Sequence, residues 1–121
     1  MPRPILEEQH LHPAIRERVA SHHADTLKQV QQAVASHPVV VIGMTSNPFV
    51  KKARKALDAA GIRHHDIDIG SYFGDWRRRN ALKMWCGWPT LPMVFVKGVL
   101  VGGAEDMIKL IDSGELKRSL G

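Results

Sequence analysis

The stretch 88–103 constrains the fold of this chain more than any other part of the sequence. It begins with Pro89 and Pro92, which restrict the backbone of a loop. Two apolar runs follow on either side of Lys97-Gly98, a suitable two-residue hairpin turn, and the pair Gly102-Gly103 ends the second run. These features predict a rigid loop, two antiparallel strands and a glycine turn into a helix.

Helices and strands alternate along the rest of the chain. The apolar run 39–42 is typical of a central strand that is buried on both faces. Apolar residues at helical spacing predict a helix that begins with Asp25 as its N-cap and stops before Pro38. Further elements are expected as follows: a short helix over 13–23, a helix from Pro48 to Gly61 that buries Phe49, Ala53, Ala56, Leu57 and Ala60, a strand with Ile67 and Ile69, a helix over about 74–85, a helix through Met107 and Ile111, and a tail helix after Gly114. This order predicts an α/β fold in which the first two strands are parallel.

Size and composition allow one domain. The chain has 121 residues, of which 44% are hydrophobic, enough for a single core. No apolar stretch approaches the roughly 20 residues that span a bilayer, and the N-terminus lacks a secretory pattern. Cys86 is the only cysteine, so no internal disulfide can form. We therefore expect a cytoplasmic protein with no membrane partner.

The positive charge does not by itself indicate nucleic-acid binding. The formal net charge is +5, and the basic residues group on the polar sides of two expected helices. No aromatic residues interleave with them as a base-stacking surface requires, so we do not expect a nucleic-acid partner. The seven histidines are scattered and no cysteine pair accompanies them, so no metal site is expected either.

Three stretches of the sequence resemble glutaredoxins, namely 25–40, 82–103 and 113–117. The likeness covers about residues 25–120 and is closest to the single-cysteine, or monothiol, branch. It implies a thioredoxin-like α/β fold with a four-stranded mixed sheet flanked by helices. Residues 1–24 lie outside the likeness and are expected to form an N-terminal arm or short helix, with the first 12 poorly ordered, and 25–121 form the glutaredoxin-like domain.

The resemblance also implies a groove for glutathione. In glutaredoxins the proline of a Thr-x-Pro step is cis, the residue before it presents its backbone to glutathione, and the Gly-Gly turn opens a helix that receives a glutathione carboxylate. Carried over to this sequence, the glutathione-binding residues are Arg79, Thr90, Leu91, Pro92, Gly103, Ala104 and Glu105. Glu105, or alternatively Asp106, would receive the ammonium group of the ligand.

The nucleophilic cysteine of the family is missing from this sequence. Asn47 stands at its place before Pro48, and Met44 and Met93 stand where the family pattern has Lys and Gln. Glutaredoxin catalysis and iron–sulfur cluster binding both depend on that thiolate, so the resemblance implies a degenerate catalytic site and no cluster. Because Asn is among the best N-cap residues, we expect Asn47 to cap the helix that Pro48 begins.

Three functions remain open at this point. The first is a groove that binds glutathione, or an extended cysteine-containing peptide or protein, without ordinary thiol–disulfide oxidoreductase activity. In the second, Cys86 acts as the redox thiol of a glutaredoxin-like enzyme. In the third, the chain is a protein-interaction module that works through its N-terminal arm.

Overall fold

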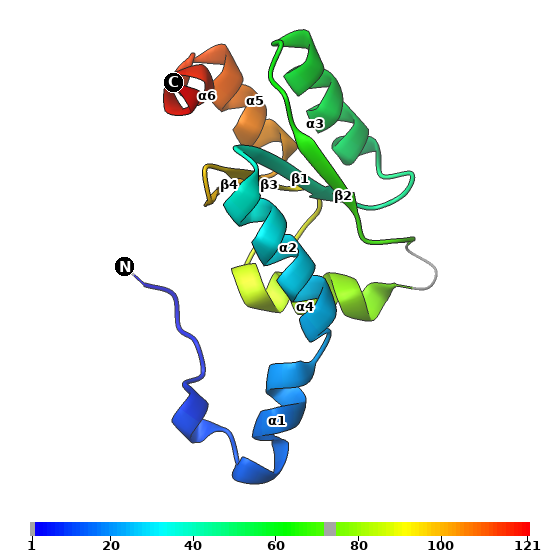
Figure 1. Cartoon of the computed structure of the whole chain (residues 1–121), viewed down its shortest axis with the longest axis vertical. Helices are drawn as coiled ribbons and strands as arrows, with labels where there is room; N and C mark the ends of the chain where they lie inside the picture. Colours follow the sequence, from blue (N-terminus) through cyan, green and yellow to red (C-terminus); the bar gives the residue numbers. More distant parts are fainter. Residues whose placement is uncertain (1, 72–74) are drawn as a thin grey trace.

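A four-stranded mixed sheet lies at the centre of the computed structural model, which describes residues 2–71 and 75–121 (Figure 1). The strand order is β2-β1-β3-β4, and β1 is parallel to β2 but antiparallel to β3. The strands are β1 (Val39–Gly43), β2 (His65–Asp68), β3 (Met93–Val96) and β4 (Val99–Gly102). The predicted thioredoxin-like α/β fold is confirmed.

Helices cover both faces of this sheet. They are α1 (Pro13–Ser21), α2 (Ala24–Ser36), α3 (Pro48–Ala59), α4 (Trp76–Cys86), α5 (Ala104–Asp112) and α6 (Glu115–Leu120), with a 3-10 turn, η1 (Glu8–His10), before α1. Figure 1 shows α2 and α4 on one side of the sheet and α3, α5 and α6 on the other. The crossover from β1 through α3 to β2 therefore joins the parallel pair, as the sequence predicted.

The strand β1 supplies both halves of the core, because its alternate side chains point to opposite faces. Val40 and Ile42 belong to the cluster under α2 and α4, whereas Val39 and Val41 belong to the cluster under α3 and α5. All five residues of β1 are buried. The apolar run thus forms a central strand as expected.

The turn of the β3–β4 hairpin takes an unusual backbone conformation. Lys97 and Gly98 have φ angles of +48° and +81°, so both occupy the left-handed region that a type I′ turn requires. The Lys97 N–H donates to the carbonyl of Pro38 at 2.7 Å, which fastens the turn to the start of β1. The predicted hairpin turn is confirmed.

Several predicted boundaries are wrong. Helix α2 begins before Asp25, because the His23 carbonyl already accepts the first helical bond from Leu27 N–H at 3.1 Å. Phe49 is 56% exposed, since the buried stripe of α3 is Val50, Ala53 and Leu57. The strand β2 ends before Ile69, and α4 begins at Trp76, while the predicted start at 74 lies outside the described residues.

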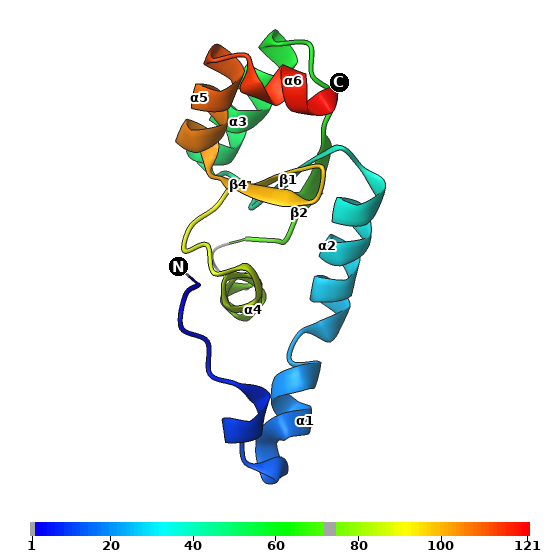
Figure 2. The same ribbon diagram turned by 90° about the vertical axis from the view of Figure 1, so that its left-hand side faces the viewer.

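The N-terminal arm extends away from the sheet. Helix α1 has no buried residue, and the arm contains η1 where a poorly ordered segment was expected. At its start the arm returns to the end of α4, where the guanidinium of Arg3 covers Gly87 so closely that a Cβ there would overlap it (Figure 2). Within the described part of the chain, no helix is long and apolar enough to cross a membrane.

Candidate functional site

Asn47 caps the helix that follows the first strand. Its Oδ1 accepts hydrogen bonds from the backbone N–H groups of Phe49 at 2.8 Å and Val50 at 3.1 Å, and Pro48 takes the first helical position. The residue is only 6% exposed. The side chain therefore satisfies two of the N–H groups that a helix N-terminus leaves unpaired, as predicted.

The proline loop lies beside this cap. The Leu91–Pro92 peptide bond is cis. A hollow of about 430 Å³ is lined by residues from both segments: Asn47, Pro48, Phe49, Arg79, Lys83, Pro89, Thr90 and Leu91. Residue 47 and the proline loop, separated by more than 40 positions in the sequence, thus share one surface depression.

A second hollow continues toward α5. Its volume is about 250 Å³, and it is lined by Phe49, Trp88, Thr90, Leu91, Pro92, Gly103, Ala104, Glu105 and Asp106. Phe49, Thr90 and Leu91 line both hollows. We call the two together the groove. All seven residues predicted to bind glutathione line it.

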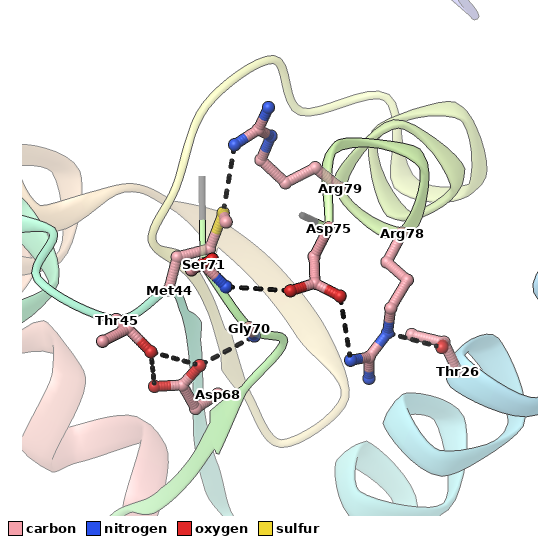
Figure 3. Close-up of polar contacts among 9 residues, drawn as sticks. All are labelled: Thr26, Met44, Thr45, Asp68, Gly70, Ser71, Asp75, Arg78 and Arg79. Carbon is pink, nitrogen blue, oxygen red and sulfur yellow. Dashed lines mark hydrogen bonds and ion pairs between the residues drawn. The ribbon is translucent and has the colours of Figure 1, made fainter. Parts of the chain in front are cut away.

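The first hollow has a cationic wall. Arg79 and Lys83 come from neighbouring turns of α4, and both are half-buried. The Arg79 Nη1 group donates to the Met44 sulfur at 3.7 Å (Figure 3). A guanidinium and an ammonium group on one wall favour a ligand that carries a carboxylate.

The start of α5 closes the other end of the groove. Gly102 has a φ of +113°, and a Cβ there would lie 2.6 Å from the Asp106 carboxylate, so the turn requires glycine. Asp106 Oδ2 accepts the Gly103 N–H at 3.1 Å. Glu105 instead forms an ion pair with Lys52. The two alternatives for an ammonium ligand therefore already have partners within the protein.

Polar contacts support the loop that leads from β2 toward the groove. Asp68 accepts hydrogen bonds from the Thr45 hydroxyl at 3.0 Å and from Gly70 N–H at 2.8 Å. Asp75 accepts the Ser71 N–H at 3.0 Å and lies 3.9 Å from Arg78 (Figure 3). These contacts hold the start of α4, and with it Arg79, against the end of β1.

Cys86 does not occupy the place of the missing thiol. It is the last residue of α4, and its Sγ contacts the buried Met93 sulfur at 3.5 Å and accepts the Trp88 N–H at 3.4 Å. The residues that line the groove do not include it. The thiol is half-buried behind the proline loop.

Phe49 and Lys83 line the groove although the sequence did not place them there, and so do Trp88 and Pro89. Phe49 was expected in the core, but its place in the first turn of α3 turns it outward between the two hollows. Lys83 lies four residues after Arg79, so the helical period alone places both on one face of α4. That spacing was the available signal.

Comparisons with known proteins agree with this geometry. Residues 39–101 match the sequence model of the family described as glutaredoxin. This chain belongs to the glutaredoxin family. The match spans the central strand, the cap, α4, the proline loop and the hairpin, and it includes the groove residues from Asn47 to Pro92 but not those at the start of α5.

Relatives of this glutaredoxin-family chain include monothiol glutaredoxins. It is 39% identical over 102 residues to a glutaredoxin-like protein of Dictyostelium discoideum, covering 84% of this chain and 83% of that protein. It is 35% identical over 99 residues to monothiol glutaredoxin-S17 of Arabidopsis thaliana, covering 78% of this chain but only 20% of that larger protein. Among solved structures, a buckwheat glutaredoxin–glutathione complex superposes with a TM-score of 0.72 at 29% identity, covering 83% of this chain and 91% of that one.

Proposed function

We propose that this protein binds glutathione, or an extended cysteine-containing peptide or protein segment of similar chemistry, and does not catalyse ordinary thiol–disulfide exchange. The observation that carries the proposal is that Asn47 and the loop with the cis Pro92 line the same surface depression. The groove is therefore present, but the residue at its helix N-cap is an amide and not a thiol. The proposal places Asn47 where glutaredoxins have the nucleophile. It includes a cytoplasmic location and no nucleic-acid or membrane partner.

The groove offers complementary groups along its length. Arg79 and Lys83 suit a carboxylate at one end. At the other end, the first turn of α5, with Ala104 at its start, presents backbone N–H groups to a second carboxylate. Between them the backbone of Leu91 suits pairing with an extended ligand. The buckwheat neighbour, a complex with glutathione, supports this ligand.

Catalysis at residue 47 is chemically excluded in this proposal. Thiol–disulfide exchange needs a thiolate that attacks a disulfide sulfur, and a carboxamide is no such nucleophile. The Asn47 oxygen is moreover engaged by two backbone N–H groups. The donor set also does not fit an iron–sulfur cluster, because the thiolate ligand is replaced by this amide and Cys86 packs on Met93.

A titration with reduced glutathione tests the binding proposal. We expect amide chemical shifts of Leu91, Gly103 and Ala104 to move with added ligand. Arg79→Ala should weaken binding about tenfold, as expected for loss of a charged contact to a carboxylate. Arg77→Ala, which removes an exposed arginine stacked on Trp76 in the same helix, is the matched control and should leave the affinity unchanged. Unmoved resonances at millimolar ligand would reject the groove.

A second candidate function rests on the surroundings of Cys86. The sulfur is half-buried and accepts the Trp88 N–H, and as a thiolate it could attack oxidised glutathione, form a mixed disulfide and release reduced glutathione. Incubation with oxidised glutathione should then add one glutathionyl mass, and Cys86→Ser should abolish the addition. An unmodified wild-type chain would count against this function.

A further inference from the structure

An apolar hollow ringed by cations lies at the end of the molecule away from the groove. Its volume is about 450 Å³. Buried Val39 and Ile62, with half-buried Leu120, form an apolar floor. Arg63, Lys97 and Lys117 also line it, as does Gly121, but no residue with an acidic side chain does. We call it the basal hollow.

No side-chain carboxylate of the described residues compensates the positive charges of the basal hollow. Among residues 2–71 and 75–121, no carboxylate side chain forms an ion pair with Arg63, Lys97 or Lys117. Three unpaired cations around an apolar floor suit a ligand that presents an apolar group next to carboxylates.

The N-terminal arm carries such a segment. Ile5 and Leu6 are each 66% exposed, and Glu7 and Glu8 follow them directly. Within the described part of the chain neither glutamate has an ion-pair partner. The run Ile5-Leu6-Glu7-Glu8 is therefore complementary to the basal hollow in both hydrophobicity and charge.

In one chain the arm does not line its own basal hollow. Figures 1 and 2 place α6, which borders the hollow, and α1, to which the arm leads, at opposite ends of the long axis. The Arg3 guanidinium lies against Gly87 at the end of α4. Only a second copy can bring the segment to the hollow while the arm keeps this placement.

We propose that the basal hollow binds the segment Ile5-Leu6-Glu7-Glu8 of a second copy of this chain. Leu6 or Ile5 covers the apolar floor, and the two glutamates pair with Arg63 and Lys117. The contact is head-to-tail, so each copy keeps one free arm and one free hollow, and association can continue. The contact surface is small, so the association is weak and transient.

Sedimentation velocity of the full chain over a range of concentrations tests this proposal. The sedimentation coefficient should rise with concentration and the rise should diminish at high salt. Glu8→Lys and Lys117→Glu should each weaken self-association about tenfold, the loss expected for reversing one charge of a pair. A chain that carries both reversals, Glu8→Lys with Lys117→Glu, should regain association, because each reversed arm then meets a reversed hollow. Circular dichroism confirms that each variant is folded.

Matched controls separate this contact from a general effect of charge. Glu17→Lys on α1 and Lys28→Glu on α2 change the net charge equally at exposed positions outside the contact, and both should associate like the parent. A chain that stays monomeric at every concentration would overturn the proposal. Association that is unchanged in both Glu8→Lys and Lys117→Glu would also overturn it, because the interface would then lie elsewhere. Because glutathione binding is measured at the other end of the molecule, the two proposals fail independently.

Discussion

The Asn47 side chain caps α3 by hydrogen bonding, and its contribution to stability can be measured by substitution. Its Oδ1 accepts from two backbone N–H groups at the buried start of α3. Asn47→Ala should lower the free energy of unfolding by about 1 kcal/mol, the usual cost of losing an N-cap, as read from urea denaturation. Asn47→Asp should retain the cap. Asn80→Ala, at an exposed site within α4, should cost nothing, and an equal loss there would contradict the capping role.

A cysteine introduced at position 47 should have a lowered pKa because it lies at the N-terminus of α3. Asn47→Cys places a sulfur at the N-terminus of α3, where unpaired N–H groups stabilise negative charge. We expect the pKa of this new thiol to lie below the ordinary value of about 8.5, measured by the pH dependence of alkylation in a Cys86→Ser background. An ordinary pKa would mean that the helix does not act on residue 47.

At the level of elements, the link between α3 and β2 depends on a histidine between two carboxylates. His64 Nε2 lies 2.8 Å from Asp58 Oδ1, and Nδ1 lies 2.6 Å from Asp66 Oδ1. Burial lowers the pKa of His64, but the hydrogen bonds and the charges of Asp58 and Asp66 outweigh it, so the pKa is raised above 6.5.

This raised pKa gives the fold a pH dependence. Because the folded state binds the proton more tightly, the stabilisation is fully present below pH 6.5 and is lost as pH rises through the folded pKa. The difference in unfolding free energy between the parent chain and His64→Gln should therefore shrink from pH 5.5 toward pH 8. His10→Gln in the exposed arm is the control. A difference that grows with pH would contradict the assignment.

The turn into α5 gives a second test at this scale. Gly102→Ala places an alanine at a φ of +113° and its Cβ against the Asp106 carboxylate. We expect the free energy of unfolding, measured by urea denaturation, to fall by about 1 to 3 kcal/mol. Gly98→Ala also meets positive φ, but nothing lies within 4 Å of its Cβ position, so it should cost less. Equal costs would show that Asp106 does not crowd this turn.

For the whole molecule, we propose that residues 25–121 fold without the arm. Helix α1 buries no residue. A chain that starts at His23, which keeps the first turn of α2, should have a thermal midpoint within a few degrees of the full chain. Its self-association should nevertheless be lost, because the segment 5–8 is gone. A large fall in the midpoint would show that the arm belongs to the folded unit.

The sequence predicted most of this architecture because the decisive signals are local. The apolar run of β1, the Lys97-Gly98 turn and the Asn47 cap each follow from neighbouring residues. The predicted N-cap of α2 was wrong by two residues: His23, in the left-handed conformation, is the N-cap, and Asp25 lies in the first turn. Arg3 and Gly87 are far apart in the sequence, and neither hydrophobic periodicity nor residue spacing predicts that they lie against each other.

The central claim is a glutaredoxin groove that binds its ligand but lacks the nucleophile. The most direct measurement is the glutathione-dependent reduction of a glutathionylated peptide by the wild-type chain and by Cys86→Ser, under conditions where titration shows the groove to be filled. We expect binding in both chains and no turnover above the uncatalysed rate. Turnover by the wild-type chain would contradict the claim, and its loss in Cys86→Ser, which contains no thiol, would assign the activity to Cys86.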